Sequence, residues 1–304
     1  MKVPPFLSLA FLFLLGTPLA RAAFKICAFN IKSFGEAKAA NVEVMGVLVK
    51  ILVRCDISLI QEVRDSKGEV VPALIKEMNR FDAYHQYRYL ESKRLGRNSY
   101  KEQYVFIYRP NVVEVRDTYQ YVEGQEADEE DVFARGPFIV RFYSPKTVIK
   151  DFVLVALHAS PRGAAKEIHK LFRVIEEVRE NWKTEVEIQE TGAGENIMLL
   201  GDLNAACAYL TMEDRKSIRL SSGDRFHWLI DDKADTTVRQ KTHCAYDRIV
   251  VHGDEFLYGV VPGSAKPFNF AKKLGLSEEE ALEVSDHFPV EVNLRPDRRT
   301  DREL

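Results

Sequence analysis

Four apolar runs in this sequence each end on polar residues that could bind a metal ion or transfer a proton. In chain order these residues are Asn30, Glu62, Asp202 with Asn204, and Asp286 with His287. The exit ends of buried strands are where α/β proteins build active sites. Carboxylate and amide oxygens suit hard cations, and imidazole exchanges a proton near neutral pH. This repeated placement predicts one convergent site.

The segment Gly201-Asp202-Leu203-Asn204 has the spacing of two side chains that share a face. Residues two apart in an extended chain point to the same side, so Asp202 and Asn204 would offer a carboxylate and an amide together. Gly201 would allow a ligand to approach the backbone. A polar turn is the alternative. Glu62 ends an apolar run, where a buried unpaired charge is costly, and Mg²⁺, Mn²⁺ or Ca²⁺ would offset that cost. An ion pair with Arg64 is the alternative.

Two histidines stand at predicted strand ends and could transfer protons. His287 follows Asp286 between a predicted helix and a strand, and His158 follows the run 152–157. Asp247 opens another strand and could orient an imidazole, as carboxylates behind a histidine do. A surface Asp-His pair is the alternative for 286–287. A structural role is the alternative for His158.

The segment 95–102 mixes basic, aromatic and acidic side chains. Arg97 and Lys101 could contact phosphates, while Tyr100 stacks or packs. Glu102 precedes a predicted strand and would be one more acid at a strand end. A solvated hairpin loop is the alternative for the whole segment.

Strand-like runs alternate with helical patterns along the chain, so we expect an α/β fold, and a single domain is the simpler interpretation. Apolar residues recur at helical spacing in 44–52 and 168–182, and Ser277 with Glu280 forms a capping box that opens a helix ending near Val284. The predicted strands are 24–29, 57–61, 104–108, 138–142, 152–157, 197–200, 247–251 and 290–294.

Residues 1–22 have the pattern of a secretory signal, with Lys2, the apolar run 6–15 and the cleavage site Ala20-Arg21-Ala22. We therefore expect secretion through the endoplasmic reticulum and no membrane span. The net charge of the 304-residue chain is -3. It becomes -5 without Lys2 and Arg21, which excludes a basic field over the whole molecule but leaves room for a local basic rim. Residues 295–304 form a short tail of mixed charge.

Four cysteines in a secreted chain indicate disulfide bonds. Cys207 and Cys244 lie in polar, loop-like stretches that flank the candidate site and are the expected pair. Cys27 and Cys55 stand at the start of two apolar runs. A second disulfide and two buried thiols are both compatible with those positions.

With these motifs assembled, the chain resembles the deoxyribonuclease I family. The resemblance runs from about residue 24 to residue 294. It rests on the strings AFNIKSFGE, LIQEVRDS, LGRNSYKEQY, LGDLNAACAY, ADTTV, CAYDRIVV and SDHFPVEV. The segment KEQYVFIY and the positions of Cys27 and Cys55 are also similar to the gamma-like branch of the family.

The resemblance implies a catalytic domain over 23–294 with two packed β-sheets flanked by helices, a four-layer α/β/β/α sandwich. It implies endonucleolytic hydrolysis of DNA that leaves 5′-phosphates, helped by Mg²⁺ and Ca²⁺. Matched residue by residue, the metal and phosphate centre is Asn30, Glu62, Asp202, Asn204 and Asp286. The histidine–carboxylate pairs are His158 with Glu102 and His287 with Asp247. The DNA-contacting positions are Lys32, Arg64, Tyr100, Arg135 and Tyr246.

Several positions depart from the family pattern. Lys32 stands where the best-known member of the family has arginine, so a point charge would replace a bidentate contact with phosphate. Gly136 replaces a glutamate of one structural calcium site, of which Glu123 and Asp131 could keep part. Asp235 and Thr237 match the other calcium loop. Glu91 lies in the region that contacts actin in one member, so we expect no actin binding, and we expect a monomer.

Two other functions are compatible with parts of this pattern. A different phosphoesterase, acting on a phospholipid or an inositol phosphate, would share the metal centre; Arg64, Tyr100 and Arg135 favour a polymer substrate instead. A binding protein without activity would have lost at least one catalytic position, and the sequence retains them all. Of the two histidines, we favour His287 as the base because it adjoins Asp286.

Overall fold

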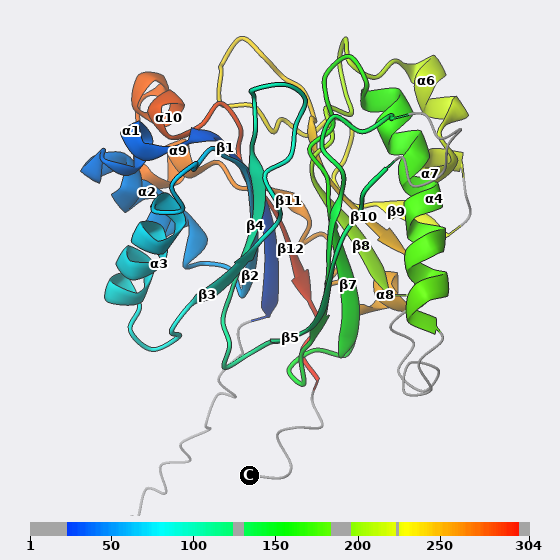
Figure 1. Cartoon of the computed structure of the whole chain (residues 1–304), viewed down its shortest axis with the longest axis horizontal. Helices are drawn as coiled ribbons and strands as arrows, with labels where there is room; N and C mark the ends of the chain where they lie inside the picture. The colour runs from blue at the N-terminus through cyan, green and yellow to red at the C-terminus, as the bar shows by residue number, and fades with distance from the viewer. Residues whose placement is uncertain (1–22, 124–130, 184–195, 223–224, 298–304) are drawn as a thin grey trace, which may run out of the picture.

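The computed structural model describes residues 23–123, 131–183, 196–222 and 225–297. Two six-stranded sheets pack face to face, and helices cover their outer faces (Figure 1). The predicted single-domain α/β/β/α sandwich is therefore confirmed. The expected signal segment 1–22 and the end of the expected tail lie outside the described residues.

The first sheet contains the N-terminal strands and the last strand of the chain. Its members are β1 (Phe24–Phe34), β2 (Ile57–Val63), β3 (Arg88–Glu91), β4 (Gln103–Tyr108), β11 (Lys266–Pro267) and β12 (Val290–Leu294). Their order is β11-β12-β1-β2-β4-β3. β1 pairs in parallel with β2 and antiparallel with β12, so the blue strand β1 and the red strand β12 lie side by side (Figure 1).

The second sheet is built from the middle of the chain. Its members are β5 (Glu114–Gln120), β6 (Phe138–Tyr143), β7 (Asp151–Ala156), β8 (Ile197–Asp202), β9 (Phe226–Trp228) and β10 (Asp247–His252). Their order is β5-β6-β7-β8-β10-β9. β7, β8 and β10 are buried along their whole length, which explains why their sequences read as nearly continuous apolar runs.

Helices flank the sheets and close the sandwich on both sides. They are α1 (Glu36–Ala39), α2 (Val42–Leu52), α3 (Val70–Phe81), α4 (Ala164–Lys183), α6 (Met212–Ser217), α7 (Arg219–Ser222), α8 (Asp254–Gly259), α9 (Phe270–Leu274) and α10 (Glu278–Val284). The predicted capping box is present at the start of α10. Within the described ranges, none of these helices has the length and apolar character that a membrane crossing requires.

Three apolar clusters hold the layers together. One lies between the sheets and includes Phe106, Phe142 and Phe152, all fully buried. The second packs α4 onto the second sheet, and the third packs α2, α3, α9 and α10 onto the first. Burial of each large apolar side chain contributes about 1.5–3 kcal/mol to the free energy of unfolding, so the packed sheets hold the residues at their edges in place.

All eight predicted strands are present, and several extend beyond the predicted bounds. β1 continues to Phe34 and β2 to Val63. The sequence analysis missed β3, β5, β9 and β11. All four lie at the edges of their sheets. β3, β5 and β9 have exposed or half-buried side chains and β11 has only two residues, so none carries a buried apolar pattern.

Two disulfides link the described cysteines. Cys207–Cys244 confirms the expected pair, and Cys27–Cys55 resolves the alternative that the sequence left open. Cys27 lies in β1, while Cys55 lies in the turn between α2 and β2. The spacing along the chain gave no geometric reason to pair them; the parallel alignment of β1 and β2 does.

Candidate active site

Seven side chains from both sheets converge at one end of the sandwich. β1, β2 and the approach to β4 supply Asn30, Glu62 and Glu102, while β7, β8 and β10 lead to His158, Asp202 and Asp247. The seventh is His287, which lies between α10 and β12. The predicted convergence of strand-end residues is therefore present in the structure.

Asp202 lies at the centre of this group and is almost fully buried, with 2% of its surface exposed. Its Oδ2 accepts a hydrogen bond from Asn30 Nδ2 at 3.1 Å. The Nε2 atoms of His158 and His287 lie 3.6 Å from the same oxygen. Oδ1 accepts from the backbone N–H of Asn204 at 3.0 Å. One carboxylate therefore faces two imidazoles that arrive from different elements.

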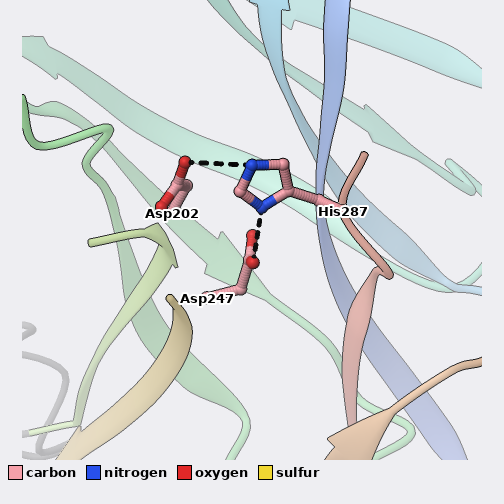
Figure 2. A group of neighbouring side chains, drawn as sticks. All are labelled: Asp202, Asp247 and His287. Atoms are coloured by element: carbon pink, nitrogen blue, oxygen red, sulfur yellow. Dashed lines mark hydrogen bonds and ion pairs between the residues drawn. The ribbon is translucent and has the colours of Figure 1, made fainter. Parts of the chain in front are cut away.

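The His287 ring is held between two carboxylates (Figure 2). Its Nδ1 lies 2.8 Å from Asp247 Oδ2, and its Nε2 faces Asp202. The backbone N–H of His287 bonds to Ser285 Oγ, and Ser285 Oγ–H in turn donates to Asn30 O at 2.6 Å. These contacts fix both the ring orientation and the loop that carries it.

The second imidazole has a matching arrangement. His158 Nδ1 lies 2.6 Å from Glu102 Oε1, and its backbone N–H donates to Tyr104 Oη at 2.8 Å. Arg135 Nε lies 3.1 Å from the same Glu102 oxygen and donates to His158 O at 3.0 Å. Arg135 is thus largely buried beside the pair, and its match to a DNA-contacting position of the family stays a prediction.

The carboxylates determine how these histidines hold their protons. Burial by itself lowers the pKa of His287, but Asp247 and Asp202 outweigh burial and raise it to about 10. Burial likewise lowers the pKa of His158, and Glu102 more than reverses that effect. Burial raises the pKa of Asp202, yet the two imidazoles hold it below its ordinary value. Without a metal ion, His287 is therefore an imidazolium at neutral pH.

In the presence of a chelator, the free energy of unfolding is expected to fall as the pH rises. The folded state raises the pKa of His287 from 6.5 to about 10, so the stabilisation is complete below pH 6.5 and is lost as the pH rises through about 10. The loss should be on the order of a few kcal/mol. Urea denaturation at about pH 6, 8 and 10 measures it, and an unchanged pH dependence in His287→Asn would contradict the assignment.

The backbone around the site adopts unusual conformations. Lys32, Ser33, Glu62 and Asn204 all have positive φ, between 48° and 59°. Each such residue costs about 1–3 kcal/mol and persists only where the surroundings enforce it. Ser33 N–H donates to Glu62 Oε2 at 2.9 Å, and Asn204 Nδ2 donates to Ala159 O at 2.9 Å. The turns therefore aim Glu62 and Asn204 into the site.

The donor set of the site fits a divalent cation. Among the described residues, Asp202, Asp247 and His287 have ligand atoms within 4.8 Å of one another. Asn30 Nδ2 joins the carboxylates of Glu62 and Asp202, at 3.0 and 3.1 Å. Asp286 is one-third exposed and lies 3.3 Å from Lys32 Nζ. Several anionic oxygens gathered in a buried position suit a hard cation.

A family model described as the Endonuclease/Exonuclease/phosphatase family matches residues 27–287. The chain belongs to this family. Deoxyribonuclease gamma of Homo sapiens is 46% identical over 277 residues, covering 91% of this chain and 87% of that protein. Deoxyribonuclease-1 of Mus musculus is 49% identical over 271 residues, covering 89% of this chain and 91% of that protein. These identities also confirm the resemblance to the deoxyribonuclease I family.

Solved structures of the endonuclease/exonuclease/phosphatase family share the fold. A family protein from Leptotrichia buccalis matches with a TM-score of 0.60 at 14% identity, covering 90% of this chain and 100% of that one. A second, from Bacteroides vulgatus, matches with a TM-score of 0.58 at 16% identity, covering 91% and 100%. At such low identities the likeness concerns the two-sheet architecture alone.

The rim of this endonuclease/exonuclease/phosphatase site carries the expected basic and aromatic residues. The Arg64 guanidinium lies 4.3 Å from the ring centroid of Tyr100, and Tyr100 is 41% exposed. The Tyr246 ring lies 6.3 Å from the His287 ring. Lys101 instead bonds to Gly96 O, and Arg97 to Asp131 O. These last two contacts order the loop itself.

The two candidate calcium regions differ in their surroundings. Asp235 Oδ1 accepts from the N–H and Oγ1 of Thr237, and its Oδ2 lies 2.9 Å from His243 Nδ1. Thr237 also pairs with His287 in an isolated bridge, so this loop supports the site directly. Glu123 accepts from Phe133 N at 2.7 Å, while residues 124–130 between it and Asp131 lie outside the described ranges.

The structure adds a lysine that sequence reasoning missed. Lys38 Nζ donates to three carbonyl oxygens, those of Ile31, Lys32 and Val284. Burial is the main reason why its pKa falls to about 8. The lysine joins the end of β1 to the end of α10, whose next residues lead to His287. A lysine in a polar stretch of sequence gives no sign of this role.

Proposed function

We propose that this chain is a secreted, metal-dependent endonuclease that hydrolyses DNA with little sequence specificity. The products would carry 5′-phosphate and 3′-hydroxyl ends. The observation that supports this most directly is the pair of imidazoles at 3.6 Å from one Asp202 oxygen, each backed by its own carboxylate. Phosphodiester hydrolysis needs one group to deprotonate water and another to protonate the leaving oxygen.

The proposed ligands of the divalent ion, Mg²⁺ or Mn²⁺, are Asn30, Glu62, Asp202 and Asp286. A cation held by these oxygens would supply positive charge to the phosphate and lower the pKa of the adjacent imidazoles. The side-chain amide of Asn204 donates to Ala159 O, and its backbone N–H donates to Asp202 Oδ1. Asn204 therefore stays fixed beside Asp202. We assign Ca²⁺ to the Asp235–Thr237 loop and, in part, to Glu123 and Asp131.

In this proposal His287 is the general base and His158 the general acid. Asp247 keeps the His287 ring oriented with Nε2 toward Asp202, where water would be activated. Glu102 and Arg135 orient His158 in the same manner. Asp247 and Asp202 raise the pKa of His287 to about 10, so its action as a base at neutral pH would require a bound cation that offsets these carboxylates.

The rim supplies contacts that do not distinguish sequences. Lys32 and Arg64 would neutralise phosphates, and the exposed Tyr100 ring beside Arg64 would enter the minor groove. Phosphate contacts position a duplex without reading bases, so binding should weaken steeply with salt. The mature enzyme would start after Ala22, act as a monomer and bind no actin, and its two disulfides suit an oxidising compartment.

Purified protein is expected to nick and then linearise supercoiled plasmid when Mg²⁺ and Ca²⁺ are present. The fragments should be substrates for a ligase directly, because 5′-phosphates and 3′-hydroxyls remain. Sphingomyelin and an inositol polyphosphate serve as comparison substrates and are assayed with the same enzyme preparation. Hydrolysis of either of these without cleavage of plasmid would contradict the proposed function.

A further inference from the structure

One buried amide links the two sheets directly beneath the site. Gln61 belongs to β2 of the first sheet and has no exposed surface. Its Nε2 donates to Leu157 O at 2.7 Å, and its Oε1 accepts from Asp202 N–H at 2.8 Å. Both partners belong to the second sheet, at the ends of β7 and β8. The side chain therefore spans the interface between the layers.

The partners of Gln61 are the backbone groups next to the proposed catalytic residues. Leu157 immediately precedes His158, and the bonded N–H is that of Asp202 itself. We propose that Gln61 is a positioning residue that sets the spacing between His158 and Asp202. It touches neither substrate nor metal in this role and acts through the two strand ends. The inference rests on the proposed nuclease function.

Gly201 shows that the backbone is adapted to this link. It adopts φ of +132°, and a Cβ there would lie 2.4 Å from Leu157 O and 2.5 Å from Gln61 Nε2. Real Cβ atoms do not approach other atoms so closely, so any side chain at 201 would displace the amide or the carbonyl. The glycine therefore leaves room for the bridge, in addition to the ligand access expected from the sequence.

A second amide lies beside Gln61 and completes the connection. Asn30 and Gln61 are partners in the parallel register of β1 and β2. Asn30 Nδ2 bonds to the Asp202 carboxylate, while Gln61 bonds to the Asp202 backbone. The side chain and the main chain of Asp202 are thus both fixed from the first sheet. A displacement of about 1 Å at such a residue can lower a rate by about 10²-fold.

Only an amide satisfies both partners at every pH. Leu157 O needs a donor and Asp202 N–H needs an acceptor, and an ionised carboxylate provides acceptors alone. Gln61→Met offers neither group to these partners and should lose activity. Gln61→Asn keeps the amide, but its side chain is one methylene shorter and should not reach both partners.

The test compares steady-state DNA hydrolysis by Gln61→Met, Gln61→Asn and the matched control Asn196→Leu. Asn196 is a buried amide at the other end of β8, far along the strand from Asp202. Gln61→Met should lower kcat by about 10–100-fold with KM within about twofold, and Asn196→Leu should lower Tm but leave kcat unchanged. If Gln61→Met does not fold, Gln61→Asn carries the test, because it keeps a polar amide at the site and its kcat should still fall by about 10-fold or more.

Two outcomes would overturn the role of Gln61. One is a kcat within about twofold of the parent in a folded Gln61→Met protein. The other is a kcat within about twofold of the parent in Gln61→Asn. Failure of the nuclease function is distinguishable, because the parent would then be inactive as well. The His158 ring signal in NMR, identified with His158→Asn, tests the link without substrate: it should move in Gln61→Met while the His85 signal does not.

Discussion

Replacement of His287 by alanine is expected to lower kcat for DNA hydrolysis by about 10²–10⁴-fold. The ring lies between Asp247 and Asp202 and is the group assigned to deprotonate water. The backbone contacts of residue 287, to Ser285 Oγ and Thr237, do not involve the ring, so the fold should persist. Plasmid cleavage at saturating substrate, with circular dichroism of both proteins, measures the effect.

The matched control for this prediction is His85→Ala. His85 Nδ1 lies 2.6 Å from Asp82 Oδ2, so it also forms a histidine–carboxylate pair, but in the segment after α3. Loss of that pair should leave kcat unchanged. Equal cleavage rates for His287→Ala and the parent would remove His287 from the mechanism. A large loss in His85→Ala would show that the assay reports stability.

Removal of divalent cations with EDTA is expected to abolish cleavage, a loss of about 10³-fold or more. Stabilisation of charge on phosphate by a metal ion is worth several kcal/mol, and the buried acids of the site would otherwise repel the substrate. Addition of excess Mg²⁺ should restore the rate. Full cleavage in chelator would exclude the metal from the reaction.

The variant Glu62→Gln tests whether this metal ion binds at Glu62. Glu62→Gln keeps the shape of the side chain but removes one negative charge, so more Mg²⁺ should be needed for half-maximal activity. Glu91→Gln, at the exposed end of β3, is the matched control and should leave that concentration unchanged. If both variants and the parent need the same Mg²⁺ concentration for half-maximal activity, the cation does not bind at Glu62.

The sequence predicted the centre of the site well because its residues interrupt strong apolar patterns. A charge or imidazole directly after a buried strand, as at Asp202 and His158, is costly unless it is paired or bound, so it stands out in the sequence. The apolar runs themselves indicated the central strands. Residues at the ends of these strands converge because the strands of both sheets end at the same edge of the sandwich.

Residues whose roles depend on the other sheet could not be predicted in this way. Gln61 reads as an ordinary member of the run before Glu62, and its partners lie 96 and 141 positions away. Arg135 has the charge expected of a phosphate contact, and only the packing shows that it lies behind Glu102. Edge strands such as β3 lack a buried face and carry no pattern to detect.

The adjacency of β1 and β12 has a consequence for synthesis of the protein on the ribosome. β1 emerges among the first described residues, but its antiparallel neighbour runs from Val290 to Leu294 and is translated after all the other described strands. A nascent chain without that strand lacks the partner that β1 and β11 share, and His287, just before it in the chain, emerges almost as late. Chains that end before His287 should therefore be unable to cut DNA.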